Sequence, residues 1–152
     1  MHPVYPPEAA VYRTKVQAFL AEKLPKNWGG TGQLEGEELE AFVTEWRAIL
    51  AAAGYLAPNW PVEYGGAGLT ALEQVILAEE FARAGVPGGG PNDVFGIQML
   101  GNTLLRWGTE EQKKEYRNYV LSLQNVLPCG ACRKNLKTNL LNYKFIIRIM
   151  KQ

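Results

Sequence analysis

Apolar residues recur every three or four positions along most of this chain, which is the spacing of amphipathic helices. The first such stretch begins at Pro7, where a proline followed by an acid suits a helix start, and Pro25 ends it. The second stretch is the clearest, because glutamates crowd its beginning and Gly54 closes it. Its apolar stripe contains Leu39, Phe42, Val43, Trp46, Ile49 and Leu50.

Capping signals predict where the next two helices begin. Thr70 and Glu73 have capping-box spacing and open a third helix that runs to Gly85. This helix is apolar over more than half its circumference, so we expect it to lie centrally. Asn92 or Asp93 can cap a fourth helix. That helix carries Phe95, Ile97, Met99, Leu100, Leu104, Leu105 and Trp107.

Two further helices are predicted near the end of the chain. Thr109 and Gln112 form a second capping box, and the helix that follows has Tyr116, Tyr119, Val120 and Leu123 on one side. Pro128 breaks this helix, and Cys129 begins another that continues to about Tyr143. No stretch alternates apolar and polar positions as a half-buried strand would, so the chain is predicted to be all-α.

Residues 57–70 interrupt the helical pattern with a long segment rich in proline and glycine. Pro58 and Pro61 lack amide donors, and the glycines favour tight turns or close approach of the backbone. Trp60 and Tyr64 are large and apolar, so we expect them to be buried against the core. The predicted architecture is a bundle of five to six helices with this segment packed across it as a crossover loop.

Length and composition are those of one globular domain. The 152 residues are 47% hydrophobic, and no apolar run approaches the ~20 residues of a membrane span. No secretory signal is evident, so a cytoplasmic setting with reduced thiols is expected. Charge is uneven, because residues 1–108 hold seven Lys or Arg against twelve Asp or Glu, whereas residues 109–152 hold nine against three. Tyrosines among the basic residues argue against a disordered tail, and no nucleic-acid partner is expected.

The crossover carries the most specific signal in the sequence. Residues 57–69 read Ala-Pro-Asn-Trp-Pro-Val-Glu-Tyr-Gly-Gly-Ala-Gly-Leu, and a Glu-Gln-Val-Ile-Leu-Ala-Glu-Glu-Phe-Ala-Arg-Ala run follows at 73–84. Together they resemble the N-terminal helical domain of the acyl-CoA dehydrogenases. The resemblance extends from about residue 7 to about residue 114. Residues 115–152 are predicted to be a separate basic helical segment, joined where the charge balance changes sign.

The family resemblance implies a role for the fourth helix. In acyl-CoA dehydrogenases the N-terminal helical domain covers one side of FAD and lines the slot for the acyl chain. The matching segment here is 95–101, so Phe95 and Met99 are candidate contacts for an acyl-CoA tail. Ordinary core packing is the alternative that we favour for these two residues. The glycine clusters match no phosphate-binding loop and are interpreted as turns, and no FAD-binding residue is assigned.

The same resemblance implies that more than this domain is needed for chemistry. In the family, a β-domain supplies most FAD contacts, and a C-terminal helical domain carries the glutamate that removes the substrate's α-proton. Neither fits the residues after Lys114. We therefore expect a partial dehydrogenase that is not catalytically complete alone, and whether the chain is itself an enzyme stays open. The parent enzymes generally form oligomers, so a homo-oligomer is possible.

Cys129 and Cys132 form a second candidate site. A Cys-x-x-Cys at a helix start places the first thiol where unpaired amides stabilise a thiolate, and Arg133 and Lys134 add positive charge. Residues 109–141 resemble the Cys-x-x-Cys region of FAD-linked sulfhydryl oxidases of the Erv/ALR type, which would make the pair catalytic. Asn135 stands where that family commonly has histidine. The alternatives are that the pair is redox-capable but non-catalytic, that it is simply buried, or that it shares a metal with a second chain. No metal site is assigned, because zinc needs four ligands and the sole histidine is His2.

Three functions follow from these patterns. The first is a partial acyl-CoA dehydrogenase domain that helps to enclose FAD and an acyl chain. The second is a FAD-linked thiol oxidase that uses Cys129 and Cys132. The third is a non-catalytic helical interaction module from a truncated or composite chain.

Overall fold

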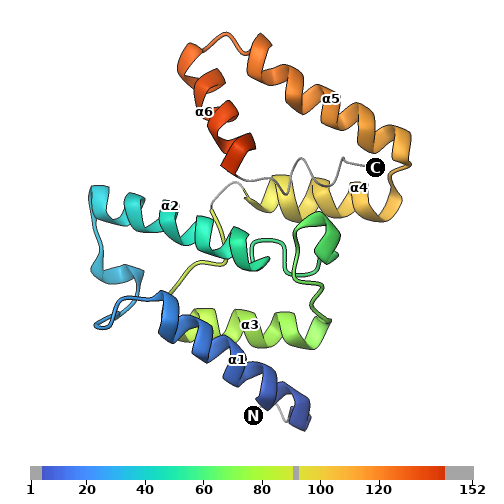
Figure 1. Cartoon of the computed structure of the whole chain (residues 1–152). Coiled ribbons are helices and arrows are strands. Elements are labelled where there is room, and N and C mark those ends of the chain that lie inside the picture. The colour runs from blue at the N-terminus through green and yellow to red at the C-terminus, as the bar shows by residue number, and fades with distance from the viewer. Residues whose placement is uncertain (1–4, 91–92, 143–152) are drawn as a thin grey trace.

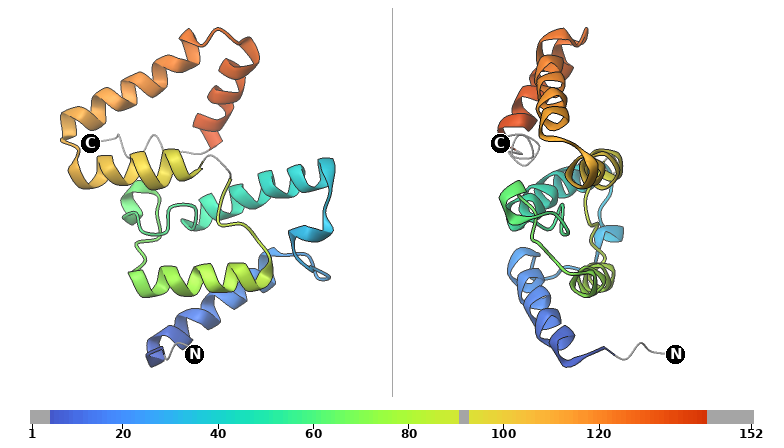
Figure 2. Two further views of the ribbon diagram at one scale, coloured as in Figure 1. Left: turned by 180° about the vertical axis from the view of Figure 1, so that it is seen from behind. Right: turned by 90° about the vertical axis from the view of Figure 1, so that its right-hand side faces the viewer.

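The computed structural model describes residues 5–90 and 93–142, and all regular structure in these ranges is helical. This confirms the all-α prediction. The α-helices are α1 (Pro7–Lys23), α2 (Gly36–Ala53), α3 (Ala71–Ala84), α4 (Asn102–Trp107), α5 (Glu110–Val126) and α6 (Gly130–Asn142). Short 3₁₀ turns η1 (Thr31–Gln33) and η2 (Val62–Tyr64) lie in the connections, and a π-helical segment, η3 (Val94–Gly101), runs directly into α4. Helices α1 and α3 pack together at one end, and the α5–α6 hairpin lies at the other (Figures 1 and 2).

The core lies among α1, α2, α3 and the crossover. Its largest fully buried side chains are Trp46, Trp60, Leu50, Ile76 and Val16. Aromatic rings join the three helices, because Trp46 of α2 lies edge-on to Phe81 of α3, with ring centroids 5.8 Å apart, and Phe19 of α1 lies 6.1 Å from the Trp46 ring. The apolar stripes predicted for the first three helices therefore form a single core.

A buried ionic cluster ties α1 to α3. The Glu80 carboxylate is only 4% exposed, and it accepts hydrogen bonds from Arg13, from Gln17 at 2.9 Å and from Arg83 at 2.5 Å. Arg13 also donates to Glu79 at 2.6 Å. A buried carboxylate is tolerated only when it is paired in this way, so this cluster sets how the two helices face each other.

The crossover is packed as predicted. Trp60 is 1% exposed, and Tyr64 is partly buried against the core. Gly66 permits this packing, because a Cβ atom there would lie 2.2 Å from the Trp60 carbonyl oxygen. Gly54, which closes α2, has a left-handed φ of 76°. The buried crossover fixes the path between α2 and α3.

The fourth predicted helix differs in two ways from the expectation. Its first eight residues are π-helical, and only Asn102–Trp107 are α-helical. Asp93 does not cap it; its carboxylate instead accepts two hydrogen bonds from Arg47, at 2.8 and 2.6 Å, and one from the Gly90 amide at 2.6 Å. A bidentate ion pair to α2 is stronger than a cap to a helix start. Asn92, the other proposed cap, lies outside the described residues.

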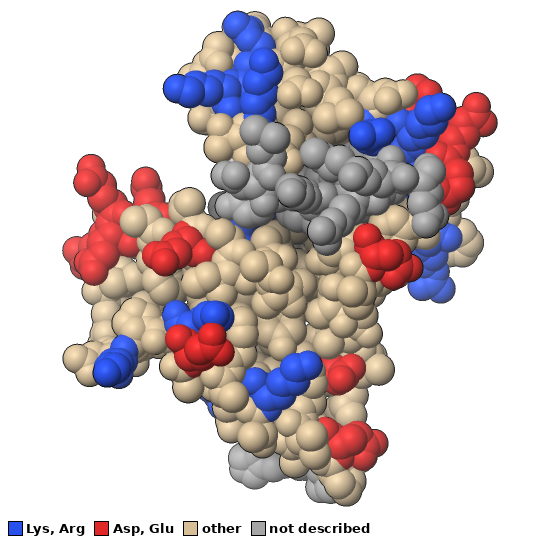
Figure 3. Space-filling view, in the orientation of Figure 1, with Lys and Arg blue, Asp and Glu red and all other residues tan. Residues whose placement is uncertain are grey.

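Helices α5 and α6 form a hairpin (Figure 1). The capping box at Thr109 is present, as is the one at Thr70. Helix α6 is described as far as Asn142, so the predicted end near Tyr143 falls outside the described residues. Acidic side chains gather over the start of α2 and basic ones over α6, in keeping with the uneven charge of the sequence (Figure 3). Within the described ranges, no helix is both long enough and apolar enough to cross a membrane.

Candidate functional site

Segment η3 carries an exposed row of apolar side chains, which we call the apolar strip. Its members are Val94, Phe95, Met99 and Leu100, which are 46%, 67%, 58% and 36% exposed. Core packing, the alternative favoured for Phe95 and Met99 from the sequence, is therefore wrong. Isolated exposed apolar residues are ordinary, but several on one segment make a feature that is typical of ligand or partner sites.

The opposite side of η3 explains why the strip faces outward. Ile97 and Gly101 are buried, and they are four residues apart, as are Phe95 and Met99. With more than four residues per turn in a π-helix, each pair lies on one side. A Cβ atom on Gly101 would be 2.1 Å from Cζ2 of Trp60, so the absence of a side chain lets η3 lie directly on the indole ring. The buried crossover thus positions the strip.

A polar corner follows the strip at the junction of η3 and α4. Asn102 Oδ1 accepts hydrogen bonds from the Trp60 indole at 2.7 Å and from the Asn59 amide at 3.0 Å. A hollow of about 310 Å³ opens there, lined by Asn59, Trp60, Pro61, Asn102, Leu105 and Arg106. Sequence reasoning missed Asn102, because its partners lie more than 40 residues away and no local motif signals the pairing.

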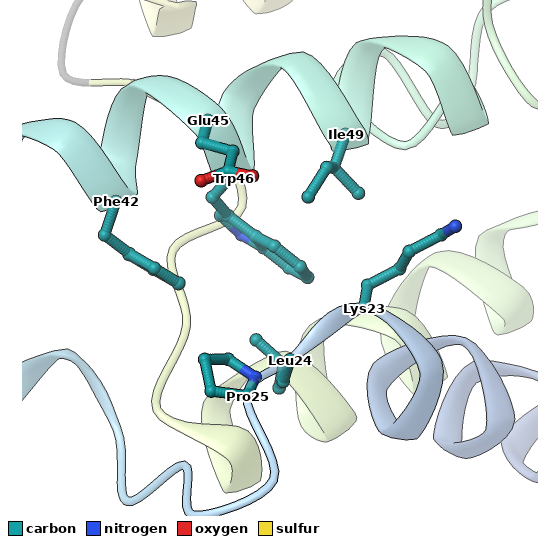
Figure 4. A pocket seen from close by; sticks show the side chains of 7 residues that line it. All are labelled: Lys23, Leu24, Pro25, Phe42, Glu45, Trp46 and Ile49. Carbon is teal, nitrogen blue, oxygen red and sulfur yellow. The ribbon is translucent and has the colours of Figure 1, made fainter.

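A second hollow lies between the end of α1 and α2. It measures about 270 Å³ and is lined by Lys23, Leu24, Pro25, Phe42, Glu45, Trp46 and Ile49. Figure 4 shows the Phe42 and Trp46 rings and the Leu24 side chain reaching toward a common space. Its walls are mostly apolar. The core residues of α2 thus form part of its lining.

Cys129 and Cys132 lie far along the chain from the strip, at the start of α6, and both are exposed free thiols. The Cys132 backbone amide donates to the Cys129 sulfur at 3.2 Å. A hydrogen bond from the Cys132 thiol, reinforced by this amide, lowers the pKa of the Cys129 thiol. The same thiol contact raises the pKa of Cys132. The apolar strip on η3 and the cysteine pair at the start of α6 are therefore two separate candidate sites.

Neither hollow suits a dinucleotide. Ligand pockets for drug-sized molecules have about 300–1,000 Å³, and FAD is larger than such molecules, whereas these hollows measure about 270 and 310 Å³. The strip is apolar, and its four side chains carry no charged or hydrogen-bonding group that would contact a pyrophosphate. Among the described residues, no group of three or more His, Cys, Asp or Glu side chains is arranged to hold a metal ion.

Comparison with known proteins matches residues 6–124 to the family described as "Acyl-CoA dehydrogenase, N-terminal domain". Acyl-CoA dehydrogenase IpdE1 of Mycolicibacterium smegmatis is 35% identical over 139 residues, which cover 89% of this chain and 35% of the relative. IpdE1 of Mycobacterium tuberculosis is 37% identical over 109 residues, covering 69% and 28%. Mitochondrial isovaleryl-CoA dehydrogenase of Pongo abelii is 31% identical over 135 residues, covering 87% and 30%. No solved structure matches.

The chain thus spans about a third of the length of these curated relatives. The matched range contains the crossover and the whole apolar strip. The comparisons give no support to the sulfhydryl-oxidase likeness of residues 109–141, which stays a prediction, as does the domain boundary at residue 114. The described fold is all-helical and organised by the buried crossover, and the family match covers most of the sequence. This chain therefore belongs to the acyl-CoA dehydrogenase family.

Proposed function

We propose that this chain supplies a helical wall of an acyl-CoA dehydrogenase, where its apolar strip lies along the acyl tail of the substrate and its crossover helps to enclose FAD. The observation that carries the proposal is the exposed row of Val94, Phe95, Met99 and Leu100 within the family-matched range. A hydrocarbon tail is the substrate part that such a surface recognises, because it offers dispersion contacts and no hydrogen-bonding groups.

Phe95 and Met99 suit this role physically. The two side chains lie one turn apart on the same side of η3, and a flexible thioether beside an aromatic ring adapts to tails of different shape. Complete burial of a phenylalanine side chain contributes about 1.5–3 kcal/mol. Because Phe95 is 67% exposed, covering it with an acyl tail would contribute about 1–2 kcal/mol.

The proposed role is positioning, and the strip itself has no acid–base chemistry. None of its four members can accept or donate a proton, and Gln98 between them is uncharged. Removing a proton and a hydride from neighbouring carbons needs a base and a hydride acceptor held together with the thioester. We assign no such step to residues 5–90 or 93–142, and we propose that other parts of the enzyme complete the site.

Nuclear magnetic resonance tests the proposal on the 152-residue chain. A ¹⁵N-labelled sample is titrated with free coenzyme A and with butanoyl-, hexanoyl- and octanoyl-CoA below their micelle concentrations. We expect the amides of residues 94–101 to shift, and the shifts to grow with acyl length. Val11 is 74% exposed on α1 and serves as an internal reference, because we expect its amide chemical shift not to change. Equal shifts with free coenzyme A, or shifts confined to other segments, would contradict the proposal.

A further inference from the structure

The start of α6 holds two thiols in a geometry suited to joining them. Cys129 occupies the position just before the helix, because its carbonyl oxygen accepts the Arg133 amide at 3.0 Å, while Cys132 lies one turn further on. Side chains three apart on a helix have Cβ atoms about 5–6 Å apart, and a disulfide needs about 3.5–4.5 Å. The Cys132 amide already reaches the Cys129 sulfur, at 3.2 Å, so only a small closure is required.

The surroundings of the pair keep Cys129 accessible and its anion stabilised. Both thiols are exposed, so a small reactant reaches them without opening the fold. The Arg133 guanidinium donates to the carbonyl oxygens of Leu127 and Pro128, which holds the turn between α5 and α6 in place. The lowered pKa of Cys129 and the raised pKa of Cys132 make the first cysteine the stronger nucleophile near neutral pH.

A bond between these sulfurs would not act as a structural staple. It would close a loop of only a few residues at the start of one helix, and it would join no second element. A disulfide across a short loop removes little conformational entropy from the unfolded chain, so such a disulfide adds little stability. A disulfide that stabilises little, at an exposed position, is readily reduced again.

We propose that Cys129 and Cys132 form a reversible dithiol–disulfide couple that exchanges with low-molecular-weight disulfides of the glutathione type, with Cys129 as the attacking residue. This site is separate from the apolar strip and does not depend on the proposed acyl-chain role.

The exchange takes place in two balanced steps. The Cys129 thiolate attacks one sulfur of the small disulfide, forms a mixed disulfide and releases one thiolate, which takes up a proton. The Cys132 thiol then loses its proton and attacks the Cys129 sulfur, which forms the intramolecular bond and releases the second small thiol. Two electrons pass from the cysteine pair to the small disulfide, which becomes two thiols.

Two single substitutions test the proposal cleanly, because the chain has only these two cysteines. Cys129→Ser and Cys132→Ser each leave one thiol, and mass spectrometry follows its reaction with oxidised glutathione at pH 7. We expect Cys132→Ser to accumulate a stable adduct of one glutathione per chain. We expect Cys129→Ser to react more slowly, because in Cys132→Ser the Cys129 sulfur still accepts the hydrogen bond from the backbone amide of residue 132, which does not depend on that residue's side chain. Equal rates for the two variants would overturn the assignment of Cys129 as the attacking residue.

The unsubstituted chain provides the second readout. In glutathione buffers of graded ratio it should convert between a dithiol and an intramolecular disulfide in one reversible two-electron transition, without a lasting adduct. An adduct that persists on the unsubstituted chain, or a disulfide between two chains in place of the internal one, would overturn the proposal. Circular dichroism checks that both variants keep their helices, which is expected because both side chains are exposed.

Discussion

Substituting Gly101 with alanine tests how closely η3 must approach the crossover. Its backbone φ of −62° is ordinary for alanine, so the difficulty is space and not conformation. The new methyl group would be 2.1 Å from Cζ2 and 2.6 Å from Cη2 of Trp60, a ring that is buried and cannot swing aside. Overpacking of this kind costs about 1–3 kcal/mol. Because the methyl group would lie so close to the indole ring, we expect a cost at the upper end, about 3 kcal/mol.

The gain from alanine offsets part of that cost. Alanine is favoured over glycine in a helix by about 1 kcal/mol, which leaves a net loss of about 2 kcal/mol. For a domain of this size, each kcal/mol of lost stability lowers the melting temperature by about 2–4 °C, so we expect the melting temperature to fall by about 4–8 °C. Thermal unfolding followed by far-ultraviolet circular dichroism measures it.

Gly96→Ala is the matched control, since Gly96 lies in the same π-helical segment and its added methyl group would have nothing within 4 Å. This variant should be as stable as the unsubstituted protein or slightly more stable, because alanine keeps its helical advantage and meets no clash. If Gly101→Ala melts at the same temperature as Gly96→Ala, the reasoning about the Trp60 contact is refuted.

Two further substitutions test the fold elsewhere. Burial alone would raise the pKa of the Glu80 carboxyl, but hydrogen bonds from Gln17 and Arg13 outweigh it and lower that pKa below its ordinary value. A lowered pKa means that the charged carboxylate stabilises the fold above the ordinary glutamate pKa, about 4.3, and that this stability is lost as the pH falls further. Glu80→Gln removes the charge from these hydrogen bonds and should therefore cost about 1.5–3 kcal/mol at pH 7 and show a shallower loss in acid; an unchanged pH profile in urea unfolding would contradict this. Thr109→Ala removes a capping hydrogen bond and should cost about 1 kcal/mol, seen as faster amide exchange in the first turn of α5, whereas unchanged exchange would show that the cap is unimportant.

The parts of the fold that were predictable from sequence are those with local causes. The capping boxes at Thr70 and Thr109 need residues only three apart, and both are present. The crossover was predictable because Pro58 and Pro61 exclude a helix while Trp60 requires burial. In each case the residues that decide the structure are neighbours in the chain.

Long-range contacts decide what was not predictable. A spacing of four between Ile97 and Gly101 fits an α-helix as well as a π-helix, so the sequence alone does not distinguish them. Asp93 has the chemistry of a cap, but Arg47 on α2 takes its carboxylate. For the candidate site, the segment followed from the family resemblance, while the outward position of its apolar side chains depends on the contact between Gly101 and Trp60.

Affinity for acyl-CoA as a function of tail length tests the central claim most directly. Calorimetry on the 152-residue chain should show binding that strengthens from butanoyl- to octanoyl-CoA. Phe95→Ala should weaken octanoyl-CoA binding about fivefold to thirtyfold, which is the fold-change expected for about 1–2 kcal/mol of lost burial. Val11→Ala alters an apolar residue on α1 that is 74% exposed, and it should leave this binding unchanged. Affinity that does not depend on tail length, or that falls equally in both variants, would contradict the account.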